Sequence, residues 1–128
     1  MAQNKKIRFG PVAMVTGSTP NLINPNVTAI TGPVGFTMTQ PYVIINHIRL
    51  VNKTAGAITV SLYIGASAAG AAGTEFLGTA LSIAANTPYD WYGMLRLDAA
   101  DFLTGSASAN TSITFEAEGE INKFFTYS

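Results

Sequence analysis

The sequence predicts an all-β protein, an antiparallel β-sandwich of the jelly-roll or immunoglobulin-like type with an extended N-terminal arm. Apolar and polar residues alternate over several short segments that recur at intervals of roughly ten residues. Glycine and proline mark turns between these segments, and no stretch has the 3.6-residue period of an amphipathic helix. The chain of 128 residues is long enough for one domain with its own core.

Residues 1–41 are expected to form the arm, with short edge strands, because prolines and glycines recur there too often for a regular helix. Short apolar pieces at residues 7–9, 12–15 and 27–30 indicate that the arm is partly docked. Residues 42–128 are expected to form the sandwich. Five of the six prolines lie in the arm, namely Pro11, Pro20, Pro25, Pro33 and Pro41.

The sandwich is expected to begin with a β-hairpin. Residues 42–52 carry apolar side chains on both parities, which is typical of a strand covered on both faces for part of its length. Residues 52–56 have the composition of a turn, and residues 58–64 alternate strictly between apolar and polar.

The rest of the chain predicts a loop, two strands, a corner and a final strand. Residues 65–75 are almost entirely Gly, Ala and Ser, which favours a flexible loop over a helix. Residues 76–84 and 89–97 are strand-like, and residues 98–105 resemble a capped turn. Residues 111–121 alternate most cleanly and predict a half-buried strand.

The composition excludes most catalytic and cofactor sites. Lys and Arg balance Asp and Glu, so no net charge draws the chain to nucleic acid or to an anionic membrane. Cysteine is absent, and the only histidine, His47, is expected to be structural. The sequence therefore predicts no catalytic residue, no metal and no cofactor. Ser, Thr and Asn together make up a quarter of the residues, so neutral polar groups must form most of the exterior.

Two groups of side chains remain as candidates for chemistry or binding. Asp98 and Asp101 could form a carboxylate pair, although capping of a turn is the favoured interpretation. Tyr89, Trp91 and Tyr92 could stack on sugar rings, whereas a place in the core and at its rim is the more common fate of such aromatic residues.

The charges are unevenly distributed along the chain. Residues 1–74 carry a net charge of +5 and residues 75–128 a net charge of −5. This polarity allows the basic end of one subunit to meet the acidic strand of a neighbour, or the arm to cover its own acidic face. Both arrangements stay open. The candidate partner-binding residues are Lys5, Lys6 and Arg8, with Glu116, Glu118 and Glu120 on one strand face.

Residues 42–121 resemble small virion proteins of tailed bacteriophages. The resemblance rests on the segments HIRLVNKT, VSLYIG, AANTPYDWYG, DFLTGSA and EGEI. It implies a non-enzymatic decoration or cement protein on the capsid exterior, bound to the major capsid protein and to copies of itself as a trimer or dimer. A tail or head–tail connector component and a carbohydrate-binding module remain alternatives. No signal peptide or membrane span is expected, so synthesis in the host cytoplasm is the default.

Overall fold

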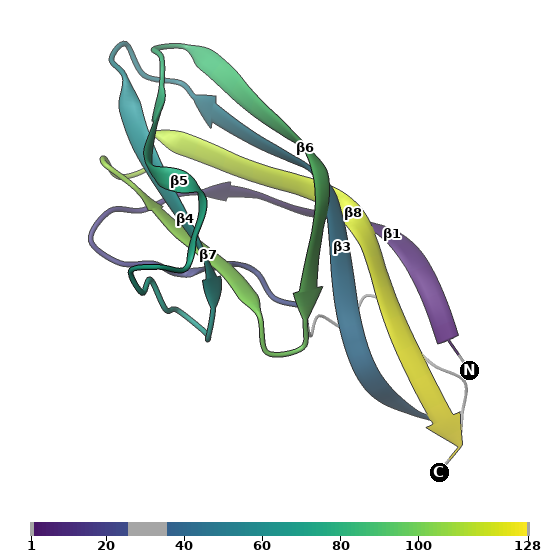
Figure 1. The fold of residues 1–128 in the computed structure, drawn as a ribbon. Helices are drawn as coiled ribbons and strands as arrows, with labels where there is room; N and C mark the ends of the chain where they lie inside the picture. The colour runs from purple at the N-terminus through teal and green to yellow at the C-terminus, as the bar shows by residue number, and fades with distance from the viewer. Residues whose placement is uncertain (1, 26–35, 128) are drawn as a thin grey trace.

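The computed structural model describes residues 2–25 and 36–127, which form strands, turns and loops (Figure 1). Because these residues include no helix, none of them forms a helix long and apolar enough to cross a membrane. The strands of the described residues are β1 (Ala2–Ala13), β2 (Asn21–Ile23), β3 (Phe36–Asn52), β4 (Ile58–Gly65), β5 (Glu75–Ile83), β6 (Thr87–Asp98), β7 (Phe102–Ala107) and β8 (Ile113–Tyr127).

The strands form two antiparallel sheets, which confirms the predicted all-β sandwich. The first sheet has the order β1-β8-β3-β6, and the second sheet has the order β2-β7-β4-β5. Every connection except the one between β4 and β5 carries the chain from one sheet to the other. Eight strands in this order form a jelly roll, so the connectivity decides between the two predicted types of sandwich.

The core lies between the sheets and is filled by alternate residues of each strand. The half-buried pattern predicted for the last strand is confirmed at Ile113, Phe115, Ala117 and Ile121, which are all fully buried. Further buried residues from the first sheet are Val43, Ile45, Ile48, Leu50, Leu95 and Leu97, and those from the second sheet are Leu22, Ile23, Val60, Leu62, Ile83, Leu103 and Ala107.

A register shift in β3 explains the apolar residues on both parities of this strand. The buried residues change from Val43 and Ile45 to Ile48 and Leu50, and the pairing shifts between Ile45 and His47 against both neighbouring strands. The strand therefore switches its inward face at a bulge, and residues of both parities reach the same core.

The predicted hairpin at residues 42–64 is wrong. β3 pairs with β6 and β8, whereas β4 pairs with β5 and β7, so the turn after Asn52 connects the two sheets. The fully buried side chain of Asn52 holds this corner. Its Nδ2 donates to the carbonyl oxygens of Gly56 at 2.9 Å and Ile83 at 3.0 Å, and its Oδ1 accepts from the backbone N–H of Thr54 at 2.9 Å.

The N-terminal strands are part of both sheets. β1 is an edge strand that pairs along β8, β2 is an edge strand beside β7, and Phe9 and Met14 are buried in the core. The boundary expected after residue 41 lies inside β3, which accommodates Pro41 at a register shift between Thr39 and Tyr42. The apolar piece at residues 27–30 lies outside the described residues.

The loop predicted at residues 65–75 is present between β4 and β5, and it is tied to the second sheet. The Asn21 side chain donates to Ser67 Oγ at 2.8 Å and accepts from the N–H of Ala68 at 2.7 Å, and Thr19 donates to the carbonyl oxygen of Ala68. Asn21 of β2 and Thr19 just before it therefore fix the loop at residues 65–75, whose own side chains are too small to pack it in place.

The corner at residues 98–105 differs from the expected capped turn. The N–H of Asp101 is bonded to the backbone oxygen of Asp98 at 2.9 Å, whereas the Asp98 carboxylate bonds Arg96. Gly105 lies inside β7 rather than closing a helical turn. It allows close contact with β4, since a Cβ there would lie 2.7 Å from the carbonyl oxygen of Ser61.

Asn52→Ala is expected to lower the free energy of unfolding by about 2–4 kcal/mol, because it leaves buried carbonyl groups without donors. Asn46→Ala is the matched control, since Asn46 is exposed and makes a single 3.4 Å bond to the oxygen of Gly93; its expected cost is below about 0.5 kcal/mol. Urea unfolding of both variants measures the difference, and equal losses would contradict the role of Asn52.

Candidate functional site

Charged side chains are concentrated on the strands of the first sheet. Eleven of the fourteen charged residues belong to β1, β3, β6 and β8, whereas the strands of the second sheet contain only Glu75. The two faces of the sandwich therefore differ in chemistry. The eleven are Lys5, Lys6, Arg8, Arg49, Asp90, Arg96, Asp98, Glu116, Glu118, Glu120 and Lys123.

The strand register arranges the outward side chains of the first sheet in transverse rows. The central row crosses all four strands, because Arg8 pairs with Glu118, Glu118 with His47, and His47 with Tyr92. On one side of it, Arg49 lies between Glu116 and Asp90. On the other side, Glu120 lies between Lys6 of β1 and Ile44 of β3. Basic and acidic groups thus alternate across the strands.

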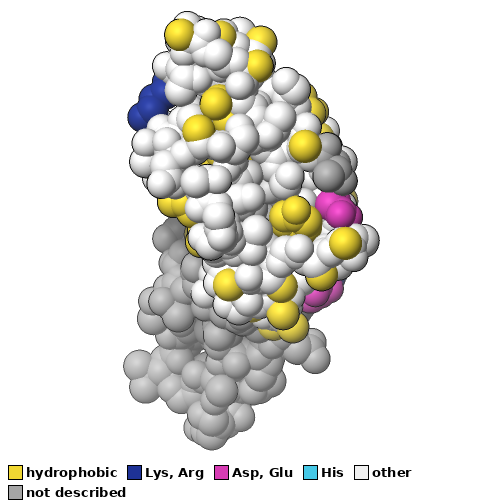
Figure 2. Space-filling model, turned by 90° about the vertical axis from the view of Figure 1, so that its left-hand side faces the viewer, with side chains coloured by type: hydrophobic (Ala, Val, Ile, Leu, Met, Phe, Trp, Pro, Cys, Tyr) yellow, Lys and Arg dark blue, Asp and Glu magenta, His cyan; other side chains and the backbone are white. Residues whose placement is uncertain are grey.

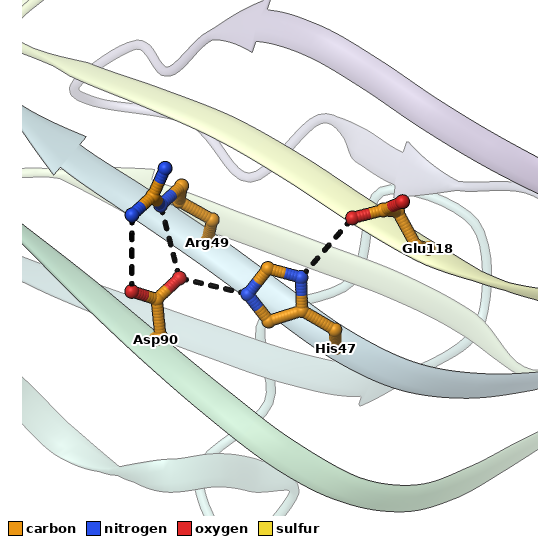
Figure 3. A network of polar contacts seen from close by, with 4 residues as sticks. All are labelled: His47, Arg49, Asp90 and Glu118. Atoms are coloured by element: carbon orange, nitrogen blue, oxygen red, sulfur yellow. Dashed lines mark hydrogen bonds and ion pairs between the residues drawn. The ribbon is translucent and has the colours of Figure 1, made fainter.

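His47 is the centre of a polar network that joins three strands (Figure 3). Its Nε2 lies 2.7 Å from Oδ1 of Asp90 on β6, and its Nδ1 lies 3.2 Å from Oε1 of Glu118 on β8. Arg49 donates from Nε and Nη2 to the two oxygens of Asp90, at 3.0 Å and 3.3 Å. The ring of Tyr92 stacks on the imidazole, with centroids 4.6 Å apart.

The geometry favours the charged form of His47. Both ring nitrogens face carboxylate oxygens that only accept, and only the imidazolium can donate from both nitrogens. Partial burial lowers the pKa of His47, but the hydrogen bonds and negative charges of Asp90 and Glu118 outweigh it and raise the pKa above its usual 6.5. The hydrogen bond from His47, followed by the bond and charge of Arg49, lowers the pKa of Asp90.

A shallow groove of about 580 Å³ lies beside this network on the outer face of the first sheet. It follows the bulge between Ile45 and His47, where Gly119 of β8 lies opposite Ile45. Its two ends differ in chemistry, since β1 contributes basic side chains and β6 an aromatic ring. The lining residues are Lys6, Ile7, Arg8, Asn46, His47, Tyr92, Glu118 and Gly119.

The predicted partner-binding residues lie side by side within one chain. Lys6 Nζ is 3.9 Å from Oε2 of Glu120, and Arg8 is the cross-strand partner of Glu118. Glu116 is the cross-strand partner of Arg49. Lys5 lies on β1, but its side chain is outside the described part of the chain. The register thus places the basic strand against the acidic strand of the same subunit.

The three candidate aromatic residues do not form one surface. Tyr89 and Trp91 pack against the core, and Trp91 meets Phe76 edge to face with centroids 5.1 Å apart. Tyr92 points to the other side and is 72% exposed. Of the candidate carboxylate pair, Asp98 is engaged by Arg96 on its own strand, with 2.9 Å between Nη2 and Oδ1.

Sequence reasoning did not connect Asp90 and Arg49 with His47. The only local signal was the spacing of His47 and Arg49, which places both on one face of a strand. Asp90 joins them only through the β3–β6 register. Among the described residues, no group of three or more His, Asp or Glu side chains is placed to hold a metal ion.

No protein-family model matches the chain, and no curated protein matches it. Among solved structures, two of infectious bursal disease virus match the chain weakly. The Gx strain structure matches with a TM-score of 0.38 and 11% identity over 100% of this chain and 34% of the other chain. The Gt strain structure matches with a TM-score of 0.37 and 8% identity over 96% and 30%. The chain spans about a third of the length of these proteins, and similarity of this degree assigns no function to it.

The stability of the chain is expected to depend on pH through this network. Because the pKa of His47 is raised on folding, its stabilisation is full below pH about 6.5 and is lost as the pH rises through the raised pKa. The pKa of Asp90 is lowered, so its stabilisation is present above pH about 4 and is lost as the pH falls through the lowered pKa. Urea unfolding at a series of pH values measures both limbs.

His47→Gln should flatten the upper limb and cost about 1 kcal/mol near pH 6. Since His47 is the only histidine, its NMR titration is unambiguous. Asp90→Asn and Glu118→Gln should each lower the pKa of His47, whereas Asp98→Asn, which removes only the partner of Arg96, should leave it unchanged. If the pKa of His47 were unchanged in the Asp90→Asn variant, the network would not be the cause of its raised pKa.

Proposed function

We propose that the chain is a non-enzymatic structural protein of a virus particle, and more specifically a decoration or cement protein on the exterior of a tailed-phage head. It would bind the major capsid protein and copies of itself. The resemblance of residues 42–121 to small phage virion proteins supports this role. The jelly roll is compatible with it, although lectins and cupins share this fold and a fold by itself does not assign a function.

The observation that carries the proposal is the outer face of the second sheet, which is neutral except for Glu75 at its β5 edge and is called the neutral face below. Thr59 on β4 pairs with Ser82 on β5, and Ser61 on β4 pairs with Ser106 on β7, so hydroxyl groups cover neighbouring strands. Burying such groups against a partner costs far less than burying ions, provided that they find hydrogen bonds. This face is therefore suited to a contact that repeats over a lattice.

The end of the sandwich beside this face has the same character. Figure 2 shows the side on which the connections β1–β2 and β7–β8 lie, and its described surface is mostly neutral polar groups with scattered apolar side chains. Charged side chains appear only near its margins. A neutral surface thus continues from the second sheet around the end of the molecule.

The charged side chains of the first sheet that the structure describes have partners or close neighbours within the chain, so we assign the shell contact to the second sheet. Lys6 and Arg8 of β1 lie opposite Glu120 and Glu118 of β8 rather than on the outer face of the second sheet. Binding to the assembled lattice but not to free subunits would stabilise the lattice by mass action. The first sheet would then face away from the shell.

Mass spectrometry of purified particles tests the role directly. A cement protein is expected in hundreds of copies per particle, because it repeats with the capsid lattice. A copy number that matches a single ring of subunits would instead indicate a tail or connector protein. Absence of the chain from the particle would overturn the proposal.

Ser82→Glu is expected to weaken attachment to particles at least tenfold, since it places a charge on the neutral face. Met94→Glu is the matched control, because Met94 is 77% exposed and lies on β6 of the other sheet. Both variants should remain folded by circular dichroism. If the Ser82→Glu variant attached normally and the Met94→Glu variant did not, the contact would lie on the first sheet, which would contradict the proposal.

A further inference from the structure

We propose that the groove on the first sheet binds a carbohydrate that carries an acidic group. The groove is lined by residues of β1, β8, β3 and β6, on the opposite side of the sandwich from the neutral face. Carbohydrate binding by the groove does not depend on the attachment of the second sheet to a particle, so either proposal can be wrong while the other is right.

The β6 end of the groove presents an aromatic platform. The ring of Tyr92 is 72% exposed, and its stacking on His47, with an interplanar angle of 10°, holds one face in place while the other stays open. A flat aromatic face packs well against the C–H face of a pyranose ring. Because the ring is already held by His47, binding costs little additional side-chain entropy.

The β1 end supplies positive charge. Arg8 makes no ion pair with any side chain that the structure describes, and Lys6 is 91% exposed with only a 3.9 Å contact to Glu120. A guanidinium group matches a carboxylate with two parallel hydrogen bonds. The acidic group of the ligand is therefore expected at this end of the groove.

The middle of the groove offers both donors and acceptors. The Asn46 amide makes one long bond to the backbone oxygen of Gly93, so most of its hydrogen-bonding capacity faces solvent. Glu118 is 56% exposed and uses one oxygen for His47. Sugar hydroxyl groups both donate and accept, so they can satisfy these two side chains together.

The floor has to remain open for a ring to lie across the strands. Gly119 lies in this floor, and a Cβ there would lie 2.0 Å from the carbonyl oxygen of Ile44, so glycine lets β8 approach the backbone of β3 closely beneath the groove. A small inorganic anion would leave Tyr92 unused, and a cationic ligand would meet Lys6 and Arg8. An acidic sugar uses the platform, the amide and the basic end at once.

The site differs from the aromatic cluster predicted from the sequence. It uses Tyr92 but not Tyr89 or Trp91, which pack against the core. Its polar residues come from β1, β3 and β8, whose side chains only the strand register brings to Tyr92.

NMR titration of the isotope-labelled full chain tests the proposal with two matched pairs of probes. These are 3′-sialyllactose against lactose, and a hyaluronan tetrasaccharide against chitotetraose, so that each acidic probe has a neutral counterpart. At least one acidic probe is expected to shift the amide signals of Asn46, His47, Tyr92 and Gly119, with a Kd of about 1 mM and about tenfold tighter than its neutral counterpart.

Variants separate the two ends of the groove. Tyr92→Ala should weaken binding of the acidic probe about tenfold, and Tyr92→Phe should retain it. Arg8→Gln should remove the preference for the acidic over the neutral probe. Met94→Ala is the control, because Met94 is exposed on the same strand but does not line the groove.

The proposal would be overturned if neither acidic probe shifted the groove signals at about 10 mM, ten times the expected Kd. Equal binding of acidic and neutral probes would also overturn it, as would equal losses in Tyr92→Ala and Met94→Ala. Since Tyr92 and Arg8 are exposed, their variants are expected to fold, and thermal unfolding checks this.

Discussion

The first sheet depends on the register shift between Ile45 and His47. In an uninterrupted strand, His47 and Arg49 would share the face of Val43 and Ile45 and would point into the core, where charged groups are costly. The bulge turns Ile48 and Leu50 inward and places His47 and Arg49 outside. Gly119 permits this on the neighbouring strand, because no other residue could approach the backbone of Ile44 so closely.

The same bulge creates the site. It places His47 in the row between Glu118 and Tyr92, with Asp90 within hydrogen-bonding distance, and leaves Asn46 exposed beside them. The groove follows the interruption in the strand rather than a gap between the sheets. A backbone irregularity that first serves to keep charge out of the core thus also positions polar and aromatic groups on the surface.

The separation of charge gives the two sheets different energetic roles. Exposed ion pairs such as Lys6–Glu120 contribute little to stability individually. The network around His47 is more effective, because His47 is only 19% exposed and is bonded to strands on both sides. The second sheet has no comparable network on its strands within the described residues, and its outer face of hydroxyl groups is cheap to desolvate. One sheet is therefore stabilised by its own polar contacts, whereas the outer face of the other sheet consists mainly of neutral groups.

The sequence by itself determined the all-β sandwich, the part of the last strand at residues 113–121 and the loop at residues 65–75, because alternation and glycine content act locally. Tertiary structure decided the jelly-roll order, since the same turn composition after Asn52 can close a hairpin or connect two sheets. It also decided the direction of His47 and Arg49, because a bulge reverses the period-two pattern on which sequence reasoning relies. The contact of His47 with Asp90, 43 residues away, follows from strand register, which no local pattern encodes.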